Sequence, residues 1–410
     1  MMAEINEVVM VSACRTPIGD YGGTLQSVRA NELSKLTVAE ALKRAGIEAS
    51  MVDDLAMGMC LHHGNGSCPA RIVAIQSGMP DSSNAMMVNQ NCASAMRALE
   101  IAAHNLMLGK TEIAVVVGTE SMSNIPYIVQ NARWGHRMGD GKLQDAMLAD
   151  GLVCQLAGNI HMGGTAENIA ERYGITREEC DQLALLSHIR AVVANDEGRF
   201  KREILPVLTK KGKKEILFEA DEHPIRGASV ESMARLSPAF KKGGVVTAAN
   251  ASGLNDASAA AVLMTKKKAD ELGLKPLMKL VNICAAGVDA KVMGLGPAVA
   301  IPKVLKQAGM KYDQVDYWEI NEAFAAQVIG VGKMIKEEAG IELNIGTLDK
   351  PGNINNNGSG IGLGHPVGCT GLRIIVSLYY EMERLGVTTG GASLCVGGGA
   401  AMASLWTRDI

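Results

Sequence analysis

Residues 89–95 place a cysteine among small residues where an apolar-periodic helix is predicted to begin. At a helix N-terminus, the free N–H groups and the helix dipole lower the pKa of a thiol, and they can also hold an oxyanion. Cys92 is therefore a candidate nucleophile. The alternative is a small buried hydrophobe in a tight helix–sheet contact, which is what an intracellular cysteine usually is.

A glycine-rich run, residues 357–368, carries His365 between Gly364 and Pro366. Its spacing fits neither a dinucleotide-binding loop nor a P-loop. Proline restricts the backbone of its neighbour, so the direction of the imidazole is set in advance. His365 is a candidate for proton transfer, and a structural histidine is the alternative.

Two more candidates stand where predicted strands end. Cys395 closes an apolar strand before three glycines, Gly397 to Gly399, whose bare backbone N–H groups can reach a ligand. Asn321 follows the strand 315–320, and in a parallel sheet this is the edge where active sites gather. The alternatives are a packing cysteine and a helix N-cap.

The elements that position these residues occur twice in the chain. The helix end 41–46 is echoed at 304–309, the strand 8–14 at 278–284, and the helix–strand unit 92–118 at 369–397. This repeat predicts an α/β protein with two similar halves, each burying a parallel or mixed sheet. If the halves pack around a pseudo-twofold axis, the four candidate residues converge on one pocket.

Residues 120–247 have no counterpart in the repeat and are predicted to form an inserted loop domain. Thr176 to Glu179 has the pattern of a helix capping box. Residues 245–264 are expected to return as a strand, a turn at 250–253 and an alanine-rich helix. The expected domains are residues 1–119 with 248–270, the insert 120–247, and residues 271–410.

The composition fits a globular protein of 410 residues, with 47% hydrophobic, 20% charged and 3% aromatic residues. A net charge of -3 gives no general attraction to nucleic acid or to an anionic membrane. The first residues lack the pattern of a secretory signal, and no uncharged stretch could span a bilayer. Nine cysteines with scattered spacing favour neither a disulfide framework nor a zinc motif. A cytoplasmic protein is expected.

Taken together, these residues resemble the thiolase family, and within it the short-chain acetyl-CoA C-acetyltransferases. The resemblance covers nearly the whole chain. It implies a layered α/β/α/β/α fold of two duplicated halves plus a loop domain, in a homotetramer or homodimer. The motifs that carry the resemblance are residues 15–19, 89–92, 118–123, 161–168, 250–256, 321–324, 364–366 and 395–399.

The resemblance assigns roles to the four candidates. Cys92 would take an acetyl group from acetyl-CoA, and His365 would accept the proton of its thiol. Cys395 would remove a proton from the methyl group of a second acetyl-CoA. A water held by Asn321, with the His365 side chain, would stabilise the enolate, and the N–H groups of Cys92 and Gly397 would hold the tetrahedral intermediate. The products would be acetoacetyl-CoA and CoA, with no metal or cofactor required.

The resemblance also predicts where coenzyme A binds. The pantetheine channel would be lined by His161 and Met162, and Ser252 would hydrogen-bond its amide. The adenine end would lie near Arg226, Ser232 and Phe240. The substrate-binding set is completed by Ala323 and Phe324.

Three other functions compete with this one. A 3-ketoacyl-CoA thiolase for longer chains would carry the same catalytic groups. A non-catalytic CoA- or lipid-binding scaffold would not need all four, and condensing enzymes that use carrier proteins usually have a second histidine at the position of Cys395. Ala93 and Ala95 stand where the family often has glycine, and they are expected to add methyl groups near the acyl pocket. Further departures are Cys68 and the alanines 400–401.

Overall fold

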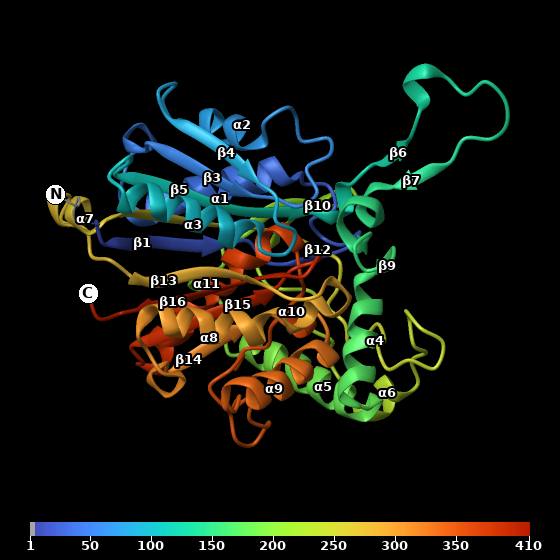
Figure 1. Cartoon of the computed structure of the whole chain (residues 1–410). Coiled ribbons are helices and arrows are strands. Elements are labelled where there is room, and N and C mark those ends of the chain that lie inside the picture. Colours follow the sequence, from blue (N-terminus) through green and yellow to red (C-terminus); the bar gives the residue numbers. More distant parts are fainter. Residues whose placement is uncertain (1–4) are drawn as a thin grey trace.

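The computed structural model describes residues 5–410, and a large mixed sheet runs through its centre (Figure 1). The first half of the chain contributes β1 (Val8–Arg15), β3 (Asp54–Gly58), β4 (Asn84–Val88), β5 (Ile113–Ser121) and β12 (Asn255–Thr265). The second half contributes β13 (Met278–Gly287), β14 (Tyr317–Ile320), β15 (Thr389–Cys395) and β16 (Ala400–Thr407).

The strand order is β14-β15-β16-β13-β1-β12-β5-β3-β4, and the short β2 (Gly19–Asp20) pairs with β12. In the sheet, β1 is the strand of the first half that lies next to the second half, and β13 is the strand of the second half that lies next to the first. These two strands pair at only two positions. The sheet therefore consists of two sheets, one from each half, joined at their edges.

Helices form layers on both sides of each sheet (Figure 1). The outer face of the first half is covered by α1 (Ala30–Ala45) and α2 (Pro69–Gln76), and that of the second by α8 (Gly296–Ala308), with α9 (Ala325–Ala339) packed against it. Between the sheets lie α3 (Ser94–Met107) and α11 (Val367–Leu385), which contact each other. Every residue of α11 from Val367 to Tyr379 is buried. These are the five layers that the sequence predicted.

The predicted repeat is also visible in the elements. The helices α1 and α8 end at Gly46 and Gly309, whose φ values of 68° and 66° lie in the left-handed region that glycine tolerates. The strands β1 and β13 meet at the join, and the helix–strand pairs α3–β5 and α11–β15 occupy matching places in the two halves.

Two predicted elements are wrong. The strand expected before the turn at 250–253 is not formed, since residues 245–249 are irregular. The alanine-rich run expected to be a helix forms β12, an 11-residue strand that is buried along its whole length. The strand pairs with β1 on one side and β5 on the other, and helices cover both of its faces. Small side chains let those helices approach closely, so tertiary packing outweighs the helix propensity of alanine.

The insert contains α4 (Met162–Tyr173), α5 (Arg177–Asp196), α6 (Val230–Ala234) and the strand pair β10 (Val207–Lys211) and β11 (Lys214–Phe218). The predicted capping box is confirmed, since the Thr176 hydroxyl accepts from the Glu179 N–H and the Glu179 carboxylate accepts from the Thr176 N–H. A long arm, residues 127–145, extends away from the body on β6 (Tyr127–Val129) and β7 (Leu143–Asp145) (Figure 1).

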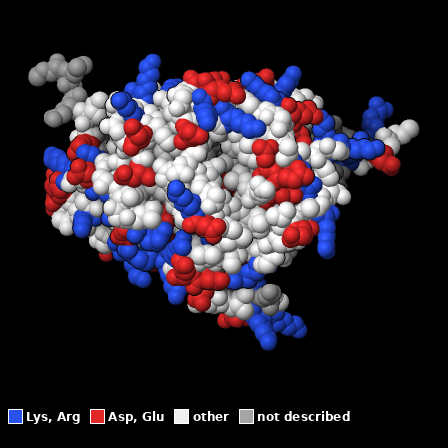
Figure 2. Space-filling model, turned by 90° about the horizontal axis from the view of Figure 1, so that it is seen from below, with Lys and Arg blue, Asp and Glu red and all other residues white. Residues whose placement is uncertain are grey.

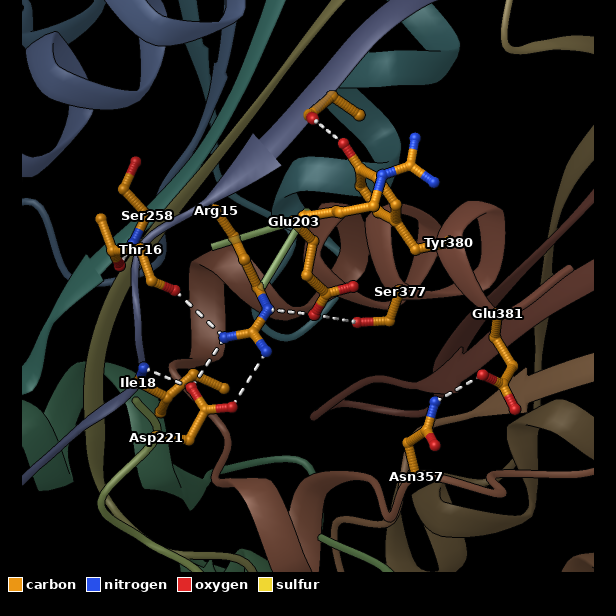
Figure 3. Close-up of polar contacts among 12 residues, drawn as sticks. Arg15, Thr16, Ile18, Glu203, Asp221, Ser258, Asn357, Ser377, Tyr380 and Glu381 are labelled. Atoms are coloured by element: carbon orange, nitrogen blue, oxygen red, sulfur yellow. Dashed lines mark hydrogen bonds and ion pairs between the residues drawn. The ribbon is translucent and has the colours of Figure 1, made fainter. Parts of the chain in front are cut away.

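A buried ion cluster ties the insert to the first strand (Figure 3). The guanidinium of Arg15 donates to Glu203 at 2.6 Å and to both carboxylate oxygens of Asp221 at 2.7 and 2.9 Å. Ser377 of α11 donates to the same Glu203 carboxylate. The cluster thus joins β1, the insert and α11 at one buried point.

The surface carries charges of both signs. On the face in Figure 2, lysine and arginine side chains are interspersed with aspartate and glutamate. Across residues 5–410, no helix combines the length and apolar character needed to cross a membrane. The same residues contain no cluster of three or more histidine, cysteine or acidic side chains suited to holding a metal ion.

Candidate active site

The turn between β4 and α3 holds Cys92 against the sheet. Ser94, the first residue of α3, donates its hydroxyl to the Asn91 carbonyl at 2.7 Å and accepts from the Gln90 N–H. A methyl group at Gly58 of β3 would lie 2.2 Å from the Ala95 backbone nitrogen. The start of α3 can approach the strand this closely only because residue 58 is glycine.

The environment of Cys92 has opposing effects on its thiol. Burial raises the pKa of Cys92 to about 11, although the N–H groups of Gly397 and of Cys92 itself lower it. At neutral pH the resting group is therefore a thiol. It needs a base to become a nucleophile, and the two N–H groups that hydrogen-bond to its sulfur favour the thiolate that then forms.

His365 is held by hydrogen bonds that fix its ring. Its Nδ1 lies 2.6 Å from the Thr370 hydroxyl oxygen, and that hydroxyl donates to the Pro366 carbonyl at 2.9 Å. Because the hydroxyl proton is used there, the oxygen accepts from Nδ1–H, and Nε2 carries the lone pair. Nε2 is buried, and no group among residues 5–410 hydrogen-bonds to it.

Burial, together with the positive charge of Arg373, lowers the pKa of His365 to about 3. The resting ring is therefore neutral, and its Nε2 is free to accept a proton. Asn255 fixes the backbone beside it, since its side-chain oxygen accepts from the His365 N–H at 2.8 Å.

Cys395 and Asn321 lie deeper than Cys92 and His365. Both are completely buried, at the ends of β15 and β14, and the Asn321 N–H donates to the Ser393 carbonyl of the neighbouring strand. Burial and the nearby Cys92 raise the pKa of Cys395. The side-chain nitrogen of Asn321 has no partner in the described part of the chain, so it is available as a donor.

A cavity of about 380 Å³ brings most of the predicted residues together. Cys92, His365 and Gly397 line it at one end of the sheet, and residues of the insert line its outer part. The predicted residues on its wall are Cys92, His161, Met162, Phe240, Ser252, Ala323, Phe324, His365 and Gly397. Cys395 packs beneath this wall in a cluster that includes Met162 and Phe324.

An aromatic pair forms part of the wall. The rings of His161 and Phe240 stack with centroids 4.7 Å apart. His161 caps α4, since its Nδ1 accepts from the Gly163 N–H at 3.1 Å. A methyl group at Gly163 would lie 2.3 Å from the Phe240 ring, so glycine at this position makes room for the pair.

Four predicted residues do not line the cavity wall: the buried Asn321 and Cys395, and the two residues predicted near the adenine end, Arg226 and Ser232. Arg226 is exposed and forms an ion pair with Asp196 at 2.7 Å. Ser232 belongs to the capping box of α6 with Ser229. Their proposed contact with the adenine end of CoA stays a prediction.

The expected effect of Ala93 and Ala95 on the acyl pocket is wrong. Both are fully buried in the core between the sheets, and neither lines the cavity. Cys68 is the N-cap residue of α2, and Ala400 and Ala401 lie in β16, so these departures are also away from the wall.

The sequence analysis did not identify several residues that shape the site. Thr370 and Asn255 fix His365, and Glu120 accepts from the N–H groups of Cys60, Leu61 and Gly368, joining both halves beside the cavity. Burial raises the pKa of Glu120 to about 7. The only signal for Thr370 was its place one helical turn after Pro366, and Glu120 stood in a motif without an assigned role.

Known proteins resemble this chain over almost its full length. The family model for the thiolase N-terminal domain matches residues 8–267, and that for the C-terminal domain matches residues 274–408. An acetyl-CoA acetyltransferase of Syntrophomonas wolfei is 47% identical over 97% of this chain and 98% of its own length.

Two solved structures show the same fold. A structure of acetyl-CoA acetyltransferase from Syntrophomonas wolfei has a TM-score of 0.96 and 68% identity, and the match covers 99% of this chain and all of that one. Human mitochondrial 3-ketoacyl-CoA thiolase in complex with CoA has a TM-score of 0.92 and 35% identity, with full coverage of both chains.

Proposed function

The chain belongs to the thiolase family, and we propose from this premise how its site carries out the acetyl-CoA acetyltransferase reaction. The enzyme joins two acetyl-CoA molecules into acetoacetyl-CoA and CoA, and it catalyses the reverse cleavage. The observation that carries the mechanism is the free, buried Nε2 of His365 on the cavity that Cys92 also lines.

In the first half of the reaction, the Cys92 sulfur attacks the thioester carbonyl as its proton passes to Nε2 of His365. The N–H groups of Cys92 and Gly397 stabilise the oxyanion. The C–S bond to CoA then breaks, and the CoA sulfur takes the proton from His365. Acetyl-Cys92 and free CoA result.

In the second half, Cys395 as a thiolate removes a proton from the methyl group of a new acetyl-CoA. The resulting enolate carbon attacks acetyl-Cys92, the C–S bond breaks, and the proton that Cys395 removed passes to the Cys92 sulfur. Acetyl-Cys92 is a thioester and cannot ionise, so a Cys395 thiolate formed in the acyl-enzyme never has a Cys92 thiolate beside it, which is one of the charges that raise the pKa of Cys395.

The enolate oxygen needs donors aimed at it. The free side-chain nitrogen of Asn321 suits it to hold a water that donates to this oxygen. His365 would be the second donor only with a proton on Nε2, whereas the first half of the reaction leaves Nε2 without one and the hydrogen bonds of Thr370 favour that tautomer. His365 therefore serves this role only while it holds a proton at Nε2.

The reaction is redox-neutral, and donors already in the site can stabilise the charge that develops at each step. We propose that it uses no cofactor or metal, with CoA thioesters as the substrates. We propose that Ser252, His161 and Met162, which line the cavity, hold the pantetheine arm, and that Arg226 and Ser232 lie near the adenine end.

We propose that the walls near Cys92 favour short acyl groups. Met122 and Val367 form a small apolar cluster against which Cys92 and Leu152 pack. A series of 3-ketoacyl-CoA substrates of increasing length tests this preference. We expect kcat/KM for thiolysis to fall beyond acetoacetyl-CoA, and a rise with chain length would favour the longer-chain alternative.

The exposed arm supports self-association. Its side chains include Trp134 and Met138, which are 85% and 96% exposed. Leu143 of the same arm is 71% exposed, and apolar side chains gathered on one exposed segment, unlike single ones, mark interaction sites. We propose that the arm pairs with another copy in a homotetramer or homodimer, and light scattering of an arm-deleted variant tests this by a lower mass.

The nine cysteines are all free thiols. Proteins of reducing compartments keep their thiols in this form. We propose that the enzyme acts in the cytoplasm.

Radiolabelled acetyl-CoA with peptide mapping tests the nucleophile. We expect one label per chain, on the peptide that contains Cys92, with release of an equal amount of CoA. Cys395→Ala should still be labelled but should form no acetoacetyl-CoA. Label on another peptide would overturn the assignment of Cys92, and condensation by Cys395→Ala would overturn that of Cys395.

A further inference from the structure

The loop that follows Cys395 has a backbone with unusual freedom. Three consecutive glycines, Gly397 to Gly399, lack the Cβ that normally limits φ and ψ, and the last two have φ values of 91° and 95°. The N–H of Gly397 nevertheless points at the Cys92 sulfur. A donor that must be aimed at a reacting atom requires contacts that hold this loop still.

Three hydrogen bonds provide those contacts. The N–H of Gly399 donates to the Val396 carbonyl at 3.1 Å, and the N–H of Val288 donates to the Gly399 carbonyl at 2.7 Å. Both come from the same half as the loop. The third is the side-chain amide of Asn91, which donates to the Gly397 carbonyl at 2.8 Å and belongs to the opposite half.

Asn91 is itself fixed in the nucleophile turn. It directly precedes Cys92, and its φ of 47° is a left-handed conformation that asparagine tolerates better than most residues. Its N–H donates to the Asn89 side-chain oxygen at 2.9 Å, and its own side-chain oxygen faces the Cys60 thiol at 3.6 Å. These contacts place the amide nitrogen toward the glycine loop.

We propose that Asn91 is a positioning residue for acyl transfer, locking the Gly397 loop to the nucleophile turn so that the N–H groups of Cys92 and Gly397 converge on one oxyanion. This proposal rests on the proposed function. A side chain at residue 397 would also be crowded, because its Cβ would lie 3.1 Å from the Met162 sulfur and 3.3 Å from the Asn91 amide nitrogen. The loop and the amide are therefore in direct contact.

Two variants remove the donor and keep the backbone conformation accessible. Asn91→Gly removes the whole side chain, and Asn91→Asp keeps the shape but offers no N–H. We expect the rate of the CoA burst on mixing with acetyl-CoA to fall about fivefold or more in both, with KM nearly unchanged. The matched controls are Asn131→Gly and Asn131→Asp, since Asn131 has a φ of 61° and lies in the exposed arm.

A second measurement distinguishes a change in the direction of the Gly397 N–H from a general loss of stability. The Gly397 N–H lowers the pKa of Cys92, so a loop that loses its anchor should shift the pH profile of Cys92 alkylation to higher pH. An unchanged burst rate and an unchanged profile in both variants would overturn the proposal. Loss of folding in both would also overturn it, because Asn91 would then be a structural residue.

The proposed function and this inference can fail separately. If the wild-type enzyme forms no acetyl-Cys92, the function fails, whatever the variants do. If the wild type is acetylated and the Asn91 variants match it, only the role of Asn91 fails.

Discussion

At the scale of single residues, the site is a thiol and an imidazole held neutral by their surroundings. Burial raises the pKa of Cys92 to about 11, and burial with Arg373 lowers that of His365 to about 3. A resting thiolate–imidazolium pair is therefore disfavoured. The proton must move as the substrate carbonyl is attacked, when charge can spread onto an oxyanion that already has donors.

The protonation state of Cys92 predicts a pH dependence of alkylation. Because the thiolate reacts and the thiol does not, the rate of Cys92 carbamidomethylation should rise about tenfold per pH unit between pH 6 and 10. Mass spectrometry of the Cys92 peptide at each pH measures this rate, and prior incubation with acetyl-CoA should protect it. A plateau already reached at pH 7 would show that a stable ion pair exists in the resting site.

The hydroxyl of Thr370 predicts a second residue-scale effect. Thr370→Val keeps the shape but removes the acceptor for Nδ1–H of His365, so the ring loses its fixed tautomer. We expect kcat for acetoacetyl-CoA thiolysis to fall roughly tenfold with little change in KM, whereas Thr370→Ser should retain most activity. Equal kcat values for the valine variant and the wild type would contradict this role.

At the scale of elements, glycines decide how closely helices approach the site. Gly163 in the first turn of α4 leaves room for the Phe240 ring, which stacks on His161 at the cavity wall. Gly58 does the same for the start of α3. The position of the binding wall thus depends on residues that themselves contact no substrate.

The pair Gly163 and Gly164 offers a matched test within one helix. Gly163→Ala should displace Phe240 and raise KM for acetyl-CoA severalfold, because its methyl group would lie 2.3 Å from the ring. At Gly164 the nearest atom would be 3.4 Å away, an ordinary contact, so Gly164→Ala should leave KM unchanged and slightly stabilise α4. Steady-state kinetics and thermal unfolding of both variants measure these effects. Equal KM values would show that Phe240 does not contribute to binding.

At the scale of the whole molecule, the two halves and the insert are joined at buried polar points. The sheets meet through two residue pairs of β1 and β13, Glu120 links loops of both halves, and the Arg15 cluster links β1 to the insert and α11 (Figure 3). Because the cavity lies where these parts meet, its shape depends on their staying together.

Removal of Arg15 should therefore weaken the contact of β1 with the insert and α11. Arg15→Met leaves the carboxylates of Glu203 and Asp221 buried without their cation, and we expect the free energy of unfolding to fall by about 3–5 kcal/mol. Burial already raises the pKa of Glu203. A carboxyl group with a raised folded-state pKa stabilises the fold at low pH and loses that effect as pH rises through the folded-state pKa, so the variant should recover stability as the pH is lowered toward the ordinary carboxyl pKa.

Urea denaturation at several pH values measures this effect. The control is Lys336→Ala, which removes an exposed ion pair with Glu342 and should change the midpoint little. If Arg15→Met unfolds at the same urea concentration as the wild type at pH 8, the cluster does not hold β1, the insert and α11 together.

The sequence by itself determined the duplicated α/β fold, the family and the types of the reactive groups. These follow from local patterns: apolar periodicity, glycine at the ends of α1 and α8, and Cys92, His365 and Cys395 in their motifs. The tertiary structure decided what depends on neighbours distant in the chain. It made residues 255–265 a strand, because buried pairing outweighs the helix propensity of alanine. It also turned the methyl groups of Ala93 and Ala95 into the core, away from the cavity. Finally, it joined Asn91 to Gly397, 306 positions apart, a contact that no local pattern could reveal.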